Sequence, residues 1–203
     1  MDFATIRNNL ERLGYRTAQY ATRHEAAAAI AASTAGLTVG FGGSMTLEEM
    51  GLYEALARRN TVYWHWRAGQ CGGMDADAVR RAAATADIYF SSVNALAVTG
   101  EIVNIDGTCN RIAGMLYGHS RVCLIAGRNK IAPDLASAID RARNTAAPLN
   151  ARRLGLTTPC AAKADRCHDC RSPQRICRAL SVMWEKPAGC AYDVVLIDED
   201  LGY

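Results

Sequence analysis

The sequence predicts an α/β protein in which a mainly parallel sheet is flanked by helices. Short apolar runs alternate with amphipathic helical patterns along most of the chain. The apolar runs are rich in β-branched and aromatic residues and end at Gly, Asn or Asp. With 203 residues, of which 50% are hydrophobic, the chain can bury one core without disulfide bonds. We therefore expect a single domain over residues 1–203.

Six segments are predicted as strands and six as helices. The predicted strands are Leu37–Phe41, Thr61–Trp66, Asp87–Val93, Glu101–Ile105, Arg121–Ala126 and Tyr192–Ile197. The predicted helices, which carry apolar residues at three- and four-residue spacing, are Asp2–Leu13, Glu25–Ala35, Thr46–Arg59, Asp75–Ala86, Asn110–Tyr117 and Pro133–Asn144. In a parallel sheet of this kind, the ligand site is expected beyond the carboxyl ends of the strands.

The alternating pattern breaks after Pro148. From residue 152 to residue 178 the sequence is polar, rich in arginine and cysteine, and poor in periodicity. Such a segment is too small to be stabilised by burial of its own apolar side chains, so we expect a bound metal to stabilise it. We predict a small cysteine-rich, metal-binding insertion, after which Tyr192–Ile197 returns to the main sheet.

Several classes of protein are excluded by the bulk properties. The opening MDFATIRNNLERLG lacks the apolar core of a secretory signal, and no run of 18 apolar residues occurs. We expect a cytoplasmic protein without a membrane span. The formal net charge of only +3 makes nucleic acid an unlikely general partner.

Four cysteines provide the strongest chemical signal. Their spacing is C-x6-C-x2-C-x6-C, formed by Cys160, Cys167, Cys170 and Cys177. Four thiolates suit either an iron-sulfur cluster or tetrahedral zinc. Because only one pair is closely spaced, the pattern favours iron-sulfur, and specifically a 4Fe-4S cluster, with zinc as the alternative. Whether three or four of the cysteines bind stays open.

The arginines around these cysteines have two interpretations. They can offset the negative charge of a thiolate-ligated cluster, or they can present a basic surface to nucleic acid. Phe, Tyr and Trp are all missing between Arg152 and Cys177, so platforms for base stacking are lacking. The first interpretation is therefore favoured.

A glycine-rich turn follows the first predicted strand. Gly42 and Gly43 permit close backbone approach, and Ser44 or Thr46 is expected to cap the next helix, with Glu49 completing a capping box. An anion is expected at this turn, although an ordinary strand-to-helix connection explains the glycines equally well.

A second group of polar residues lies near later strand ends. Asn110 and Arg111 are candidates to bind an anionic ligand, with Glu101 or Asp106 as a catalytic base and Lys130 as a phosphate or carboxylate contact. The alternative for Asp106 is structural, because VNIDGT also suits an Asp-Gly turn between a strand and a helix.

Three stretches of the chain together resemble the LUD-domain (lactate utilisation) proteins, in particular those with a C-terminal cysteine cluster. They are VGFGGSMTLEEMG, TGEIVNIDGTCNRIAGMLYGHSRVCLIAGRNKI and TPCAAKADRCHDCRSPQRIC. The resemblance implies a fold related to the sugar-phosphate isomerase and CoA-transferase superfamily. It also implies a role beside lactate oxidation with iron-sulfur and flavin-type partners. Cys109 stands where this resemblance leads us to expect a smaller residue such as Gly.

Three functions follow from these observations. The first is electron transfer through an iron-sulfur cluster in the utilisation of lactate or a related organic acid. The second is a non-redox isomerase, hydrolase or transferase that acts on a small anionic substrate and carries structural zinc. The third is a regulatory or nucleic-acid-binding module. Expected partners are a small organic-acid or phosphorylated ligand and redox proteins, and Trp64 and Trp66 raise the prospect of a homodimer.

Overall fold

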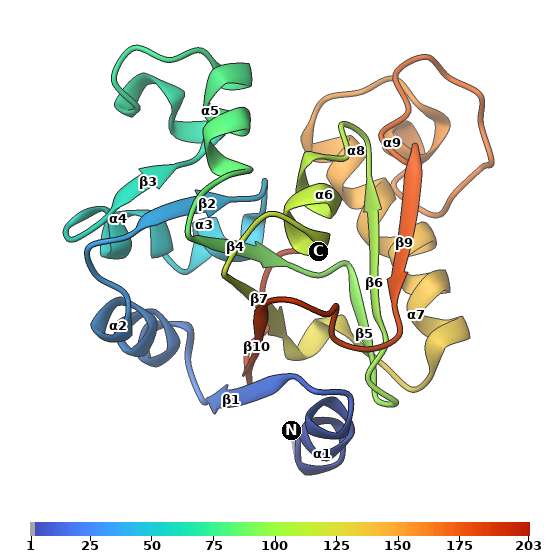
Figure 1. Ribbon diagram of the computed structural model, residues 1–203. Helices are drawn as coiled ribbons and strands as arrows, with labels where there is room; N and C mark the ends of the chain where they lie inside the picture. The colour runs from blue at the N-terminus through green and yellow to red at the C-terminus, as the bar shows by residue number, and fades with distance from the viewer. Residues whose placement is uncertain (1–2) are drawn as a thin grey trace.

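The computed structural model describes residues 3–203, so Asp2, the first residue of one predicted helix, lies outside the described part (Figure 1). Its main sheet has six strands in the order β1-β10-β7-β4-β2-β3. All neighbouring strands in this sheet are parallel, which confirms the predicted fold class. The strands are β1 (Arg16–Tyr20), β2 (Thr38–Phe41), β3 (Thr61–Tyr63), β4 (Ile88–Ser92), β7 (Arg121–Gly127) and β10 (Ala191–Ile197).

A second, smaller sheet stands beside the first and was not predicted. Its order is β8-β5-β6-β9, with β6 antiparallel to both neighbours. The strands are β8 (Ile131–Ala132), β5 (Ala95–Ala97), β6 (Ile102–Asp106) and β9 (Ala179–Met183). The predicted strand Glu101–Ile105 therefore belongs to this sheet. Strands of two or three residues are too short to show an alternating pattern in the sequence.

The central strands of the main sheet are buried on both faces, as expected for a parallel sheet covered by helices. Alternate side chains enter two different cores. Phe41, Phe90 and Ile125 pack on one side, whereas Tyr89 and Leu124 pack on the other. A third core lies between the small sheet and the helix that begins with α7.

The six predicted helices are present with changed ends, and two further helices after residue 146 were not predicted. The helices are α1 (Ala4–Arg12), α2 (Arg23–Ser33), α3 (Met45–Glu49), α4 (Leu52–Ala57), α5 (Ala76–Ala83), α6 (Asn110–Leu116), α7 (Leu135–Arg141), α8 (Ala147–Arg153) and α9 (Pro159–Lys163). The predicted helix Thr46–Arg59 is broken in two because Gly51 adopts φ +60°. Across residues 3–203, no helix combines the length and apolar character needed to cross a membrane.

Two further boundaries were predicted wrongly. The strand predicted as Thr61–Trp66 ends at Tyr63, and a 3₁₀ helix covers His65–Gln70. The helical pattern was expected to end before Pro148, but π-helical residues Ala142–Ala146 connect α7 directly to α8. Pro148 has no N–H for an i→i−4 hydrogen bond, and a widened turn just before it accommodates that loss.

One packing contact gives a direct test of the fold. A Cβ atom added at Gly40 on β2 would lie 2.3 Å from the carbonyl oxygen of Ala83 in α5. Gly40→Ala should therefore lower the free energy of unfolding by about 2 to 3 kcal/mol, because backbone must move to admit the methyl group. Urea denaturation measures this loss. Gly69→Ala is the control, because an added Cβ there meets nothing within 4 Å; equal effects at both positions would contradict the packing.

Candidate anion-binding pocket

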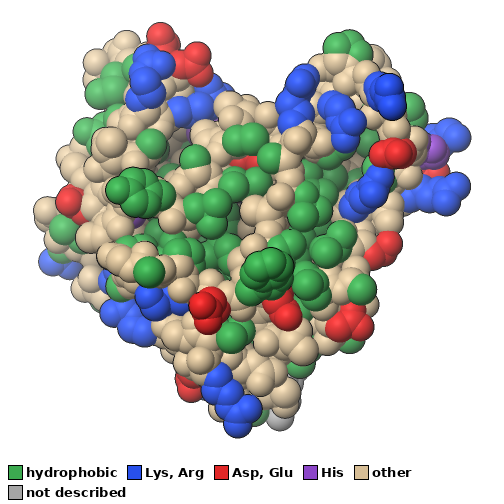
Figure 2. Space-filling view, turned by 45° about the vertical axis from the view of Figure 1, so that its right-hand side comes forward, with side chains coloured by type: hydrophobic (Ala, Val, Ile, Leu, Met, Phe, Trp, Pro, Cys, Tyr) green, Lys and Arg blue, Asp and Glu red, His purple; other side chains and the backbone are tan. Residues whose placement is uncertain are grey.

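A cavity of about 440 Å³ opens at the carboxyl-end edge of the main sheet, between its strand ends and the α6–α8 region. The surface in Figure 2 is divided by a notch into two lobes, and Lys and Arg side chains occur on both. The walls of the cavity come from the turn after β2, from the 3₁₀ helix His65–Gln70 and α5, from the ends of β4 and β6, and from α6 and α8. The polar and charged side chains lining it are Ser44, Thr46, His65, Arg80, Ser92, Asn94, Asp106, Thr108, Asn110, Arg111, Lys130, Asn150, Arg153 and Tyr203.

The glycine-rich turn forms one wall. Ser44 Oγ accepts a hydrogen bond from the Leu47 amide at 3.2 Å, so Ser44 caps α3, and it also lies 2.7 Å from Ser92 Oγ. The capping box predicted for Thr46 and Glu49 was wrong. Thr46 Oγ1 donates to the Leu201 carbonyl instead, at 3.2 Å.

Arg111 reaches the pocket from α6. Its guanidinium donates to Asn94 Oδ1 at 3.0 Å and lies 4.0 Å from Asp106 Oδ2. A Cβ added at Gly42 would lie 2.9 Å from Arg111 Cγ. The absence of a side chain at Gly42 therefore makes space for the Arg111 side chain. Burial lowers the pKa of Arg111, and Asp106 opposes this effect.

Asp106 is engaged through one of its two carboxylate oxygens. Its Oδ2 accepts the backbone N–H groups of Arg111 at 3.0 Å and Ile112 at 3.1 Å, at the start of α6. These bonds support the structural interpretation of the Asp-Gly turn, and they leave Asp106 as the counter-ion of Arg111.

Lys130 is the most deeply buried charge of the pocket, with only 2% of its surface exposed. Desolvation, followed by the charges of Arg141 and Arg111, lowers the pKa of Lys130 to about 7, while Glu49 opposes these effects. Glu49 Oε2 accepts the Gly202 amide at 2.8 Å. Among the ion pairs formed by residues 3–203, none includes Lys130.

Other residues that line the pocket were not predicted from the sequence. Burial, followed by the charge of Arg80, lowers the pKa of His65 to about 4, so this ring is neutral at pH 7. Its Nδ1 is buried without a hydrogen-bond partner in the described residues. The Arg153 guanidinium lies 4.9 Å from the Trp66 ring centroid. These side chains come from a 3₁₀ turn and two helices distant in sequence, so no local motif marks them.

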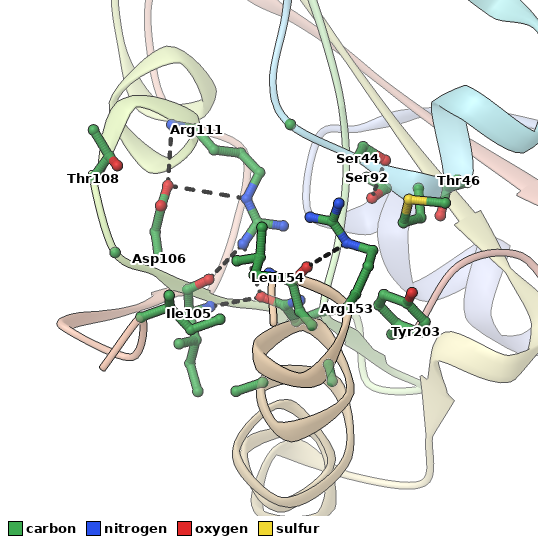
Figure 3. Close-up of a pocket in the computed structure, with 18 of the residues that line it drawn as sticks. Ser44, Thr46, Ser92, Ile105, Asp106, Thr108, Arg111, Arg153, Leu154 and Tyr203 are labelled. Atoms are coloured by element: carbon green, nitrogen blue, oxygen red, sulfur yellow. Dashed lines mark hydrogen bonds and ion pairs between the residues drawn. The ribbon is translucent and has the colours of Figure 1, made fainter. Parts of the chain in front are cut away.

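The charge balance of the pocket is strongly positive. The basic side chains among its described lining residues are Arg80, Arg111, Lys130 and Arg153, whereas the one acidic side chain is Asp106. Figure 3 shows Arg111 and Arg153 extending toward the same space from α6 and α8, near the Ser44–Ser92 pair. Such a surface favours an anionic ligand.

The structure brings together most of the predicted pocket residues. Gly43, Ser44, Asn110, Arg111 and Lys130 line the cavity, together with Asp106. Gly42 lies behind the wall, against Arg111.

Glu101 is separated from these residues. It lies in the turn between β5 and β6, where Thr99 donates to its carboxylate. Figure 1 shows this turn at the start of β6, whereas Asp106, which lines the pocket, ends that strand. We therefore assign Glu101 no role in the pocket.

The cysteine-rich segment lies between α8 and β9, and within residues 154–178 its regular structure is the short helix α9. Cys167 Sγ accepts N–H groups from Asp169, at 3.4 Å, and from Arg143, at 3.5 Å. Arg175 donates to the carbonyls of Cys170 and Cys177 at 3.0 and 2.9 Å.

No three His, Cys, Asp or Glu side chains of the described chain are gathered as ligands of one metal ion. As placed, Cys160, Cys167, Cys170 and Cys177 therefore do not form a ligand cage. The donor chemistry alone supports a metal, and the four-cysteine centre stays a prediction.

Cys109 has a backbone conformation that explains why a smaller residue was expected. It precedes α6 with φ +65°, in the left-handed region that favours glycine. The turn thus keeps a glycine-like shape.

The fold and pocket define an α/β protein with a cavity lined by basic side chains at the edge of its parallel sheet. The LUD domain matches residues 4–190, so the chain belongs to the LUD-domain family and is related to the lactate-utilisation proteins for which it is named. A solved structure of a DUF162 family protein from Deinococcus radiodurans shares the fold, with a TM-score of 0.53 at 13% identity. The alignment covers 97% of this chain and 99% of that one. No curated protein matches the chain.

Removing the buried amine tests the electrostatics of the pocket. The folded-state pKa of Lys130, about 7, lies below its unfolded value, so the cost of burying the charge is complete below pH 7 and disappears as the pH rises toward the unfolded pKa. The stability advantage of Lys130→Met over the wild type should therefore shrink by about 2 to 3 kcal/mol between about pH 6 and about pH 9.5. Urea denaturation at both pH values measures it. An advantage that does not change with pH would show that Lys130 titrates normally.

Proposed function

We propose that this protein binds a small organic-acid anion in the pocket and acts in the utilisation of lactate or a related organic acid. The observation that carries the proposal is the excess of basic side chains in the cavity, including Lys130, which is 2% exposed and has no carboxylate partner in the described residues. Keeping such a charge buried is unfavourable unless a ligand compensates it. An anion supplies that compensation.

The geometry suits a carboxylate in particular. Arginine binds carboxylates through two parallel N–H···O bonds, and Arg111 and Arg153 extend toward the same space. The Ser44 and Ser92 hydroxyls offer hydrogen bonds to a hydroxyl or carbonyl group of the ligand. A phosphorylated ligand is the alternative with the same charge, and a cavity of about 440 Å³ has room for either.

The pocket also contains a group suited to proton transfer. His65 lines the cavity with a neutral ring, because burial holds its pKa near 4. Its Nδ1 is buried and has no hydrogen-bond partner among residues 3–203. Of the two bases predicted from the sequence, Asp106 is occupied by two backbone amides, so we favour His65 for this role.

Ligand binding provides the test. Arg153→Met should raise the Kd for lactate or pyruvate about tenfold, because it removes one charge-assisted hydrogen bond. Isothermal titration calorimetry measures the change. Arg152→Met is the matched control, because Arg152 is an exposed neighbour on α8 outside the pocket lining. Equal weakening by both variants, or a wild-type protein that binds neither acid, would refute the assignment.

As a second candidate, we propose that Cys160, Cys167, Cys170 and Cys177 bind an iron-sulfur cluster, preferably 4Fe-4S, and give the protein an electron-transfer role; zinc is the alternative. The N–H···S bonds from Asp169 and Arg143 to Cys167 favour this candidate, because such donors stabilise a thiolate. The segment also lies near the pocket, since Ile176, next to Cys177, lines the cavity.

Metal and sulfide analysis of anaerobically purified protein separates these possibilities. Iron with acid-labile sulfide, lost in a Cys167→Ser, Cys170→Ser double variant, is the expected result. Cys71→Ser is the control, because Cys71 is a buried cysteine outside the segment. Zinc without sulfide would leave the cysteines a structural role, and absence of both metals would refute this candidate.

A further inference from the structure

Lys130 differs from the other basic residues of the pocket in its placement. It ends the 3₁₀ turn Arg128–Lys130, which directly follows β7, and it is buried although it lines the cavity. A Cβ added at Gly202 would lie 3.5 Å from Lys130 Nζ, which places the amine beside the Leu201–Tyr203 segment and α3. Because the lining of the cavity includes Lys130, we expect a ligand to approach it from that side.

The neighbouring acids are committed elsewhere. Asp106 accepts two amides of α6 and faces Arg111, and Glu49 accepts the Gly202 amide. The charged groups that act on Lys130 are Arg111, Arg141 and Glu49, two of them positive. Arg141 is itself tied to the Asn129 carbonyl at 2.7 Å.

Burial beside other cations favours the neutral form of a lysine amine, and a neutral amine is a nucleophile toward carbonyl groups. The pKa of Lys130, lowered to about 7 mainly by desolvation, is consistent with a substantial neutral fraction at neutral pH. Guanidinium groups in the same cavity complement a carboxylate. A ligand that satisfies both features carries a carbonyl next to a carboxylate.

We propose that Lys130 is the nucleophile of this pocket and that its Nζ forms a covalent iminium with the carbonyl carbon of a bound 2-oxo acid. The inference rests on the proposed function, because the acid must first bind in the pocket. It adds a reaction that anion binding alone does not require.

The step balances without an oxidant or reductant. The nitrogen lone pair attacks the carbonyl carbon, a C–N bond forms, and the carbonyl oxygen takes up a proton. The resulting hydroxyl group takes up a second proton and leaves as water. Because the nitrogen releases one of its own protons on the way, the net change consumes one proton and yields a protonated C=N bond and one water molecule.

Reductive trapping tests this step with pyruvate as the probe. Sodium cyanoborohydride delivers hydride to an iminium carbon and makes the adduct permanent, so intact-mass and peptide mass spectrometry can locate it. The chain has three lysines, Lys130, Lys163 and Lys186, which makes the assignment simple. We expect one adduct, on Lys130, and none with lactate, which has no carbonyl carbon to attack.

Two variants keep the test specific. Lys130→Arg retains the positive charge but lacks the primary amine, so it should form no adduct in the trapping experiment. Lys163→Arg changes an exposed lysine of α9 and should leave trapping unchanged.

The possible results separate the two proposals. Pyruvate that binds the wild type but is never trapped would overturn the iminium and leave the anion pocket standing. Pyruvate that does not bind at all would overturn both. Equal labelling of Lys163 or Lys186 would also overturn the inference, because it would show that reaction needs no pocket.

Discussion

Positive charge held in the protein interior without matching negative charge is the constraint on which the pocket depends. Lys130 is 2% exposed, Arg111 is largely buried, and Arg141 is tied to backbone carbonyls rather than to acids. Asp106 has the one carboxylate side chain among the described lining residues. Removing charges from water is costly, and here the protein itself supplies little compensation. The arrangement is therefore one that an anionic ligand stabilises.

The fold creates this arrangement where the chain crosses between its two sheets. β4 continues through Asn94 into β5, and β7 continues through the turn ending at Lys130 into β8. Both crossings leave from the carboxyl ends of parallel strands, the position at which α/β sheets commonly bind ligands. After β10, the chain returns to the same edge, where Leu201 accepts a hydrogen bond from Thr46. Residues far apart in sequence meet there because three strands end together.

The parallel sheet could be predicted from the sequence because its central strands are continuous apolar runs with strong β propensity. β1 could not be predicted from the sequence, because its residues RTAQY form an edge strand in which no side chain is fully buried. Most of the second sheet was not predicted for a different reason: β5 and β8 have only two or three residues, and β6 pairs with β9 across a long stretch of sequence. Tertiary pairing, rather than local pattern, forms them.

The same distinction applies to the site. Ser44, Arg111 and Lys130 were predicted because they follow strands or a glycine-rich turn, which are local signals. His65 and Arg153 were missed because only the packed fold turns them toward the cavity. Glu101 is the opposite case, because it was predicted for the site but does not line the pocket. It lies just before the start of β6, whereas the pocket lies at the other end of that strand. Polar residues at strand ends could thus be predicted from the sequence, whereas the tertiary structure determines which of these residues lie together in the pocket.

The most direct measurement of the central claim is the titration of Lys130 by carbon-13 NMR, observing the Cε resonance with the other two lysines as internal references. A midpoint near pH 7 is predicted, because burial lowers the pKa of Lys130 to about 7. Addition of a non-reactive acid such as lactate should raise the midpoint, because a bound carboxylate favours the charged amine. A midpoint near that of an exposed lysine, unmoved by the acid, would contradict the existence of an uncompensated cation in the pocket.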